Sequence, residues 1–213
     1  MGRSLVGWYR QSDSSFHIQQ PDGTSNPFVY GDGGSTNFPF AGDWNGDGKD
    51  QVGFYRQSDG SFHLRKLDGG SQAFVYGDGG PGTYPVAGDW NGDDRDEVGF
   101  YRQGDGSFHL RKHDGTSVAF IYGDGGSNTF PFTVDHDGDG KDEVGFYRQS
   151  DGSFHIRRQD ATSIAFSYGG GGAGTYPIGG NWDGDKPPAN VPQVVTIATS
   201  RRSGGRSARR GRP

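Results

Sequence analysis

The sequence predicts an all-β fold made of short strands and tight turns. Glycine accounts for 41 of the 213 residues, and 24 of the 26 acidic residues are Asp, because only Glu97 and Glu143 are Glu. Gly and Asp both form helices poorly and favour turns, which argues against a helical bundle. Phe, Tyr and Trp make up 14% of the chain, more than a disordered segment carries. The composition therefore indicates one domain of strands that aromatic residues hold together.

Four phrases recur in phase and define a unit of 46 residues that occurs four times. Val-Gly-aromatic-Tyr-Arg begins at Val6, Val52, Val98 and Val144, and Phe-His begins at Phe16, Phe62, Phe108 and Phe154. Aromatic-x-Tyr-Gly ends at Gly31, Gly77, Gly123 and Gly169, and aromatic-Pro begins at Phe38, Tyr84, Phe130 and Tyr176. The four repeats therefore cover about residues 6–51, 52–97, 98–143 and 144–189.

Each unit contains four short extended segments, which in one unit are 84–90, 97–103, 107–112 and 117–122. Four strands in a unit of this length are typical of a β-propeller blade, so we predict four blades of four antiparallel strands over residues 1–189. The chain begins with the last three strands of a blade and ends with a lone first strand, Tyr176–Trp182. We expect these to pair in one composite blade that closes the ring from N- to C-terminus. A larger ring pooled from two chains, and a fragment of a longer repeat array, are the alternatives.

The net charge of −5 averages two unlike parts of the chain. Residues 201–213 hold six Arg and no acid, so the remainder has 15 basic and 26 acidic residues. An acidic body disfavours binding to a nucleic-acid backbone and favours hard cations. Residues 190–213 are predicted to form a disordered basic tail, either an arm for acidic partners or a remnant unrelated to the fold. Without Cys the chain has no disulfide and no thiolate metal site.

Three Asp-rich loops between the first and second strands of a unit have the spacing of a cation site. Oxygen side chains at loop positions one, three and five converge when the chain curls around an ion, and position seven offers a backbone carbonyl. Such hard oxygen ligands suit Ca²⁺, and we expect about three calcium sites. The candidate ligands are Asp43, Asn45, Asp47, Lys49 and Asp50 in the first loop, Asp89, Asn91, Asp93, Arg95 and Asp96 in the second, and Asp135, Asp137, Asp139, Lys141 and Asp142 in the third.

The loops differ in ways that affect binding. In the second loop Asp94 replaces Gly, which predicts strain if the backbone φ there is positive. The fourth copy, at Asn181–Asp185, begins with Asn and runs into prolines, so we expect it to bind weakly or not at all. The alternative for all the loops is a set of solvated Asp-Gly turns with no ion. Trp44, Trp90 and Trp182 are expected to pack beside the loops.

These Asp-x-Asn/Asp-x-Asp-Gly loops resemble the FG-GAP/VCBS repeats found in integrin α-subunit propellers and in calcium-containing lectin propellers. The resemblance covers about residues 5–187. It implies a calcium-binding propeller and an extracellular or secreted protein, although the chain shows no signal peptide. Many loops of that family place the closing acid at position nine, where this chain has Gln51, Glu97 and Glu143. Either this residue or the Asp at position eight closes the shell.

The opposite face of the propeller is the predicted ligand surface. Its turns place aromatic rings beside paired polar side chains, which suits the stacking and hydrogen bonding of a sugar. The resemblance to lectin propellers implies that such a sugar would bind in clefts between adjacent blades. The candidate residues are Arg56, His63, Asp78, Tyr84, Arg102, His109 and Asp124. The alternative is that these Arg and His side chains hold neighbouring blades together. The aromatic residues of Val-Gly-Phe-Tyr are expected in the core.

Two function classes follow. The first is a calcium-stabilised recognition module for glycans or a partner protein, and it is favoured because no nucleophile, zinc-protease or phosphate-loop motif occurs. The second is a calcium-dependent hydrolase of esters or phosphoesters. The fourfold histidines His17, His63, His109 and His155 should not share one metal ion, since their strands lie far from the axis. We expect no membrane span, no nucleic-acid binding except through the tail, and either a monomer or a homo-oligomer that pools blades.

Overall fold

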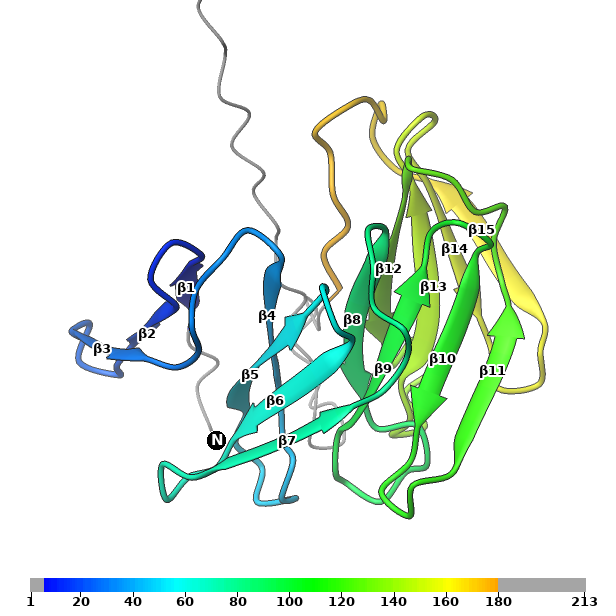
Figure 1. The fold of residues 1–213 in the computed structure, drawn as a ribbon. Coiled ribbons are helices and arrows are strands. Elements are labelled where there is room, and N and C mark those ends of the chain that lie inside the picture. The colour runs from blue at the N-terminus through cyan, green and yellow to red at the C-terminus, as the bar shows by residue number, and fades with distance from the viewer. Residues whose placement is uncertain (1–5, 180–213) are drawn as a thin grey trace, which may run out of the picture.

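A computed structural model describes residues 6–179 of the protein, and every regular element among them is a β-strand. The strands form four antiparallel sheets that follow one another along the chain (Figure 1). The first sheet contains β1 (Gly7–Arg10), β2 (Ser15–Gln19) and β3 (Ser25–Val29), and the second contains β4 (Asn37–Gly42), β5 (Gln51–Arg56), β6 (Ser61–Arg65) and β7 (Ser71–Val75). The third contains β8 (Thr83–Gly88), β9 (Glu97–Arg102), β10 (Ser107–Arg111) and β11 (Ser117–Ile121), and the fourth contains β12 (Thr129–Val134), β13 (Glu143–Arg148), β14 (Ser153–Arg157) and β15 (Ser163–Ser167).

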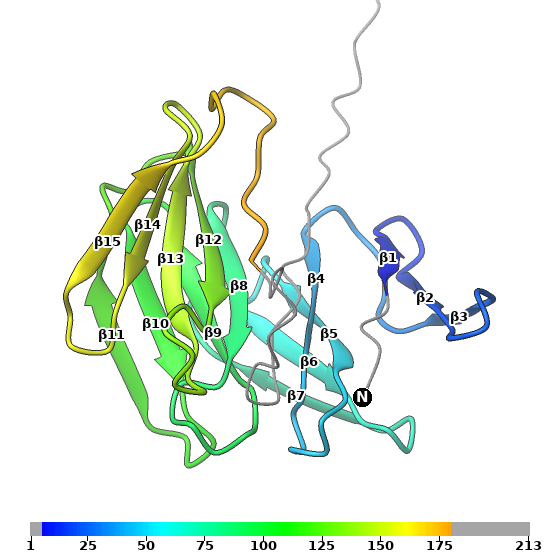
Figure 2. The same ribbon diagram turned by 180° about the vertical axis from the view of Figure 1, so that it is seen from behind.

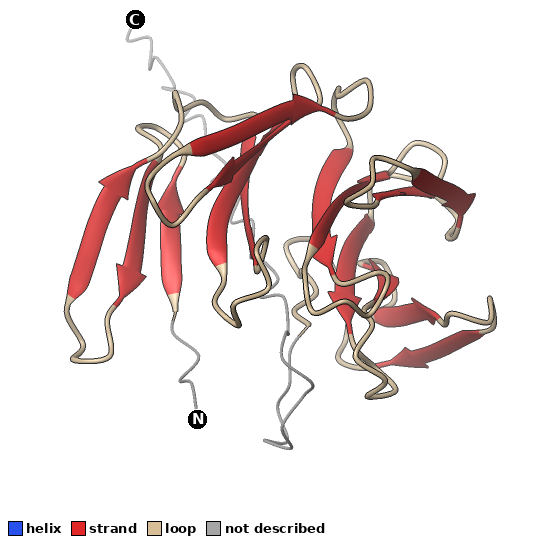
Figure 3. Ribbon diagram, turned by 90° about the horizontal axis from the view of Figure 1, so that it is seen from below, coloured by secondary structure: helices blue, strands red, loops and turns tan. Residues whose placement is uncertain are grey.

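The sheets are arranged as the blades of a propeller. The first strands of the complete sheets, β4, β8 and β12, lie towards the middle of the molecule, where β8 contacts both β4 and β12 (Figures 1 and 2). The last strands, β7, β11 and β15, form the outer edges of their sheets. Figure 3 shows from below how the successive sheets follow a curve. This arrangement confirms the all-β propeller, with strand ends within two residues of those predicted for the third sheet.

The repeated Tyr-Arg-Gln phrase of the second, third and fourth sheets bonds to the chain segment that follows each of these sheets. The Tyr55 hydroxyl donates to Thr83 Oγ1 at 3.2 Å, and Gln57 Nε2 donates to the Thr83 carbonyl at 2.8 Å. Buried side chains that bond across a boundary fix the stacking of two sheets, because either partner left alone would be a buried unsatisfied polar group. The same contact recurs in two further sets, Tyr101, Gln103 and Thr129, and Tyr147, Gln149 and Thr175.

The last of these contacts places the chain that follows the fourth sheet. Thr175 meets Tyr147 and Gln149 as Thr83 meets Tyr55 and Gln57, so residue 175 stands where a further first strand would begin. Residues 175–179 carry no strand pairing, and the rest of the predicted closing strand lies outside the described residues. The first sheet accordingly has three strands in the described part of the chain. Ring closure therefore stays a prediction, as do the fourth loop and the tail, which also lie outside.

The core confirms the predicted role of the aromatic residues. Tyr55, Phe62, Tyr101 and Phe108 are completely buried, and large buried rings dominate the hydrophobic contribution to stability. Each repeated His stacks on an aromatic ring of its own sheet, as His63 does on Phe54 with 4.3 Å between ring centroids. The histidines therefore do not converge on one ion.

Candidate metal loops and the opposite face

The first Asp of each loop shapes the backbone. The Asp43 carboxylate is fully buried and accepts the N–H groups of Gly46 and Gly48 at 2.8 and 2.6 Å. A carboxylate that accepts several backbone N–H groups curls the chain around itself. Asp89 and Asp135 do the same in their loops. The predicted conflict at Asp94 is confirmed, since its φ is 63°, in the left-handed region where Gly48 and Gly140 stand in the other loops.

The Asp at position eight reaches the neighbouring sheet. Asp96 Oδ2 accepts the N–H of Asp43 at 2.8 Å, and the Asp96 N–H donates to the Asp43 carbonyl at 2.9 Å. Asp142 and Asp89 form the same reciprocal pair at 2.9 and 2.8 Å. Burial raises the pKa of Asp96 to about 7 and also raises the pKa of Asp142 well above its ordinary range. We call these two pairs the inter-sheet latches.

Close packing around each latch explains why a Gly stands two residues before the loop Trp. A Cβ at Gly42 would lie 2.5 Å from the Trp44 ring and 2.9 Å from Asp96 Oδ2, so only Gly fits beside the latch. Gly88 meets Trp90 and Asp142 in the same way. Trp44 also packs edge-on against Phe40 at 5.5 Å between ring centroids. Trp44 and Trp90 thus pack beside the loops as predicted, and Trp182 lies outside the described residues.

The residue at position nine turns back into its own loop. Glu97 Oε2 accepts the Trp90 N–H at 3.0 Å, and Glu143 Oε2 accepts the His136 N–H at 2.9 Å. Burial raises the pKa of both carboxyls to about 7. In the first loop Gln51 takes this place and accepts the Trp44 N–H at 3.1 Å. Glu143 Oε1 is buried and has no hydrogen-bond partner among residues 6–179, which is costly for an acceptor unless something else satisfies it.

Two loops gather three possible ligand atoms within 4.8 Å of one another. One set is Asp135, Asp137 and Glu143, and the other is Asp93, Glu97 and His113. Positions one and three supply Asp135 and Asp137, position five supplies Asp93, and position nine supplies the buried acid. His113 was not among the predicted ligands because it comes from the β10–β11 turn.

The other candidate ligands lie within the loop framework. Asn45 Nδ2 donates to Asp47 Oδ2 at 3.2 Å, and Gln51 Nε2 donates to Asn45 Oδ1 at 3.3 Å, so the first loop brings amide groups to its centre. The position-five carboxylates accept the N–H of position seven, which belongs to Lys49, Arg95 and Lys141. Burial and the charge of Asp43 raise the pKa of Asp50 to about 6. Asp139 has the same backbone contact as Asp47 and Asp93.

The first loop borders a cleft of about 400 Å³ on the same face. Trp44, Asn45 and Gln51 line it from the loop, Leu67 from the β6–β7 turn, and Arg95 from the next sheet. The sequence predicted ligand binding only on the opposite face, so this cleft was not predicted. The contact of a turn with a loop from another sheet has no local sequence signal.

On the opposite face the predicted ligand residues pair across sheets and turns. Arg56 contacts Asp32 of the preceding sheet at 2.8 Å and Asp59 at 3.3 Å. His63 Nε2 lies 3.0 Å from Ser61 Oγ, which donates to Asp59. Burial, with a smaller effect of Arg56, lowers the pKa of His63. Arg56, His63 and Asp59 therefore form one connected polar group.

The remaining predicted residues repeat this group in part. His109 lies 3.0 Å from Ser107 Oγ, and Arg102 contacts Asp105 at 3.3 Å. Asp124 forms an ion pair with Arg148 of the next sheet. Burial lowers the pKa of His109, and the negative charge of Asp78 opposes this shift in part. Tyr84 belongs to a row of edge-to-face rings between Phe38 and Phe130, with centroids 5.5 and 5.7 Å away. These contacts favour an inter-sheet role for Asp124 and Tyr84 over free sugar-stacking positions, whereas Arg102 contacts Asp105 of its own turn.

Comparison with known proteins supports the fold. No family model matches the chain, and no curated protein matches its sequence. Among solved structures, the inactive H270A virginiamycin B lyase from Staphylococcus aureus with quinupristin aligns with a TM-score of 0.56 and 12% identity over 83% of this chain and 56% of that one. A streptogramin B lyase aligns with a TM-score of 0.53 and 13% identity over 82% of this chain and 55% of that one.

A lectin from Agrocybe aegerita that recognises non-reducing terminal N-acetylglucosamine aligns with a TM-score of 0.50 and 17% identity over 72% of this chain and 46% of that one. At such identities the likeness shows the fold alone. The neighbours are β-propeller proteins, so this chain is a β-propeller protein. It spans about half the length of these neighbours. In the described part of the chain, no helix is long and apolar enough to cross a membrane.

Proposed function

We propose that the chain is a calcium-stabilised propeller that recognises glycans or a partner protein outside the cell. The observation that carries the calcium part is the Asp135, Asp137 and Glu143 cluster, where the buried Glu143 Oε1 has no partner within residues 6–179. Three carboxylates that approach within 4.8 Å repel one another unless a proton or a cation intervenes. All the donor atoms are oxygens, which suits Ca²⁺. A calcium ion there would be held by these three side chains.

Recognition is proposed on the face opposite the loops, in the grooves where neighbouring sheets meet. Arg56, Asp32 and His63 present charged and aromatic groups from two sheets at one such boundary. The ion pair recurs between Asp124 and Arg148 at the boundary of the third and fourth sheets, and more than one weak site on one rigid body would give avidity. The lectin among the structural neighbours shows that this fold supports glycan recognition in another protein.

The calcium proposal is tested by thermal melting with Ca²⁺ and with EDTA. An ion that binds only the folded state stabilises it by about 2.7 kcal/mol at a hundredfold excess over its Kd. We expect Glu143→Gln to remove a large part of the calcium-dependent rise in Tm. Gln51→Glu places an acid in the corresponding position of the first loop and should enlarge the rise. A melting curve that is identical in Ca²⁺ and EDTA would contradict the calcium proposal.

The recognition proposal is tested on a glycan array and by pull-down of extracellular proteins. A bound ligand should be lost with His63→Ala and retained with Asn45→Ala, which alters the loop face only. Binding that is lost with Asn45→Ala and retained with His63→Ala would move the site to the cleft beside the first loop.

A further inference from the structure

The third sheet carries a histidine on the loop face that the other repeats lack. His113 lies in the turn between β10 and β11, where the equivalent positions hold Pro21, Leu67 and Gln159. The turn is exposed and lies on the same face as the Asp-rich loops. Since each repeat holds a different residue at this position, the fold itself does not require an imidazole there.

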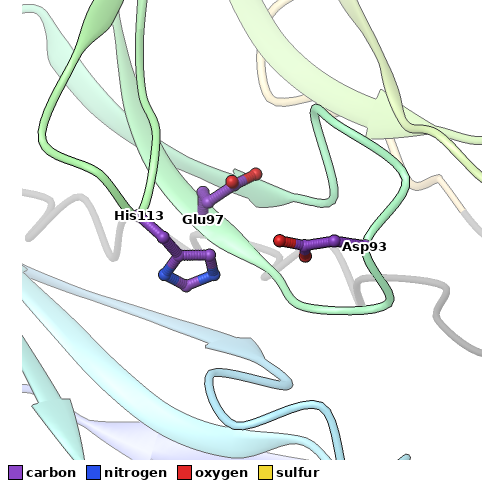
Figure 4. Close-up of side chains that lie close together, drawn as sticks. All are labelled: Asp93, Glu97 and His113. Carbon is purple, nitrogen blue, oxygen red and sulfur yellow. The ribbon is translucent and has the colours of Figure 1, made fainter.

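His113 faces two acids that come from other segments. Asp93 lies in the β8–β9 loop, Glu97 begins β9, and the possible ligand atoms of all three lie within 4.8 Å of one another (Figure 4). Glu97 is only 3% exposed. Its Oε2 accepts the Trp90 N–H and its Oε1 accepts an N–H of Asn91. These bonds orient the carboxylate in advance, as outer contacts orient the ligands of a metal centre.

The donor set differs from that of the β12–β13 loop. There the cluster consists of Asp135, Asp137 and Glu143, which offer oxygen only. In the third sheet neutral Asn91 stands at the position of Asp137, and His113 supplies a nitrogen instead. Imidazole suits Zn²⁺, Cu²⁺, Ni²⁺ and related ions, whereas Ca²⁺ takes oxygen ligands.

We propose that Asp93, Glu97 and His113 form a separate site for a divalent transition-metal ion of the Zn²⁺ class. The inference goes beyond the proposed calcium function, because it assigns a different metal to this loop and does not depend on calcium binding elsewhere. Two carboxylates and one neutral imidazole match the charge of such an ion. Three protein ligands leave one position of a tetrahedral shell open. Asp93 and His113 are exposed, so that position faces solvent and takes water or an oxygen ligand from outside.

The test uses the full chain stripped with EDTA and titrated with ZnCl₂ by calorimetry. His113→Gln introduces the residue of the fourth sheet, and His136→Gln is the matched control because it removes another loop-face histidine. We expect His113→Gln to weaken the tightest Zn²⁺ site by more than about tenfold, and His136→Gln to leave it unchanged. Far-ultraviolet circular dichroism confirms that each variant is folded.

Two further readouts separate this site from the calcium site. Titration with Co²⁺ should give visible absorption bands that His113→Gln changes, and Glu143→Gln should leave these bands as they are. Excess CaCl₂ should not displace the metal from His113. Unchanged zinc affinity in His113→Gln, or complete displacement by calcium, would overturn the proposal whether or not calcium binds at Glu143.

Discussion

The inter-sheet latch at Asp96 gives the sharpest prediction for the metal-free protein. Asp96→Asn keeps an oxygen that can accept the Asp43 N–H, which Asp96 Oδ2 accepts at 2.8 Å, and it removes the charge. The other carboxylate oxygen, Oδ1, is buried without a partner in the described part of the chain. The amide nitrogen of Asn would occupy that place.

The magnitude follows from the pKa of this carboxyl. Burial, together with the charges of Asp50, Asp43 and Asp89, raises the pKa of Asp96 from 3.8 to about 7. Ionisation therefore costs the folded state about 4 kcal/mol more than the unfolded chain. Because the folded pKa is the higher one, this carboxyl makes the protein less stable as the pH rises from about 4 to about 7, and the loss is complete above that range.

The assay is urea unfolding in EDTA at pH 4 and at pH 8. At pH 8 Asp96→Asn removes the ionisation cost of about 4 kcal/mol, and its unsatisfied amide costs about 1–3 kcal/mol, so we expect a net gain in stability. At pH 4 only the amide cost remains, and the variant should be less stable than the wild type. The difference between the two pH values isolates the charge, since the amide cost is common to both. An equal effect of the substitution at pH 4 and pH 8 would refute the reasoning.

Three other outcomes can be checked with ordinary measurements. Ala161 has a φ of 66°, so Ala161→Gly should stabilise the chain by about 1 kcal/mol, and Gly69→Ala, at the same turn position with no atom near its Cβ, should destabilise it similarly in urea unfolding. Gln103→Ala leaves the buried Thr129 carbonyl without its partner, and calorimetry should show a loss of about 1–3 kcal/mol. In an NMR titration the pKa of His63 should lie below 6.5, because burial disfavours its charged form. A loss of stability in Ala161→Gly, a neutral Gln103→Ala or a His63 that protonates above 6.5 would contradict these expectations.

The fold could be predicted because its signal is periodic. Four phrases in phase fix the number of units, and the alternation within each unit fixes the strands, so the predicted segment 107–112 differs from β10 by one residue. The Gly and Asp that first excluded helices are the turn and loop residues of the structure. The composite blade could be predicted only as a pairing of the two ends, and Thr175 is the described residue that stands where it would begin.

The site was predicted less completely, because its contacts join distant segments. The loop spacing predicted a ligand role for Asp93, Asp135 and Asp137, and the structure places them in two clusters of possible ligand atoms. The same spacing could not decide whether the residue at loop position eight or the one at position nine would complete the ligand set. Only the neighbouring sheet shows that Asp96 turns outwards as a latch. His113 belongs to no sequence motif. Its proximity to Asp93 and Glu97 becomes visible only in the structure, where the β10–β11 turn lies beside the β8–β9 loop.

The central claim is that the loop of the fourth sheet holds a calcium ion on Asp135, Asp137 and Glu143. The most direct measurement is a crystal structure grown in CaCl₂, with anomalous data that locate the ion. We predict one anomalous peak bounded by these three side chains, with oxygen distances of about 2.3–2.6 Å. A fully ordered loop that shows no peak at saturating calcium, with Glu143 Oε1 bonded to water or a protein donor, would contradict the claim.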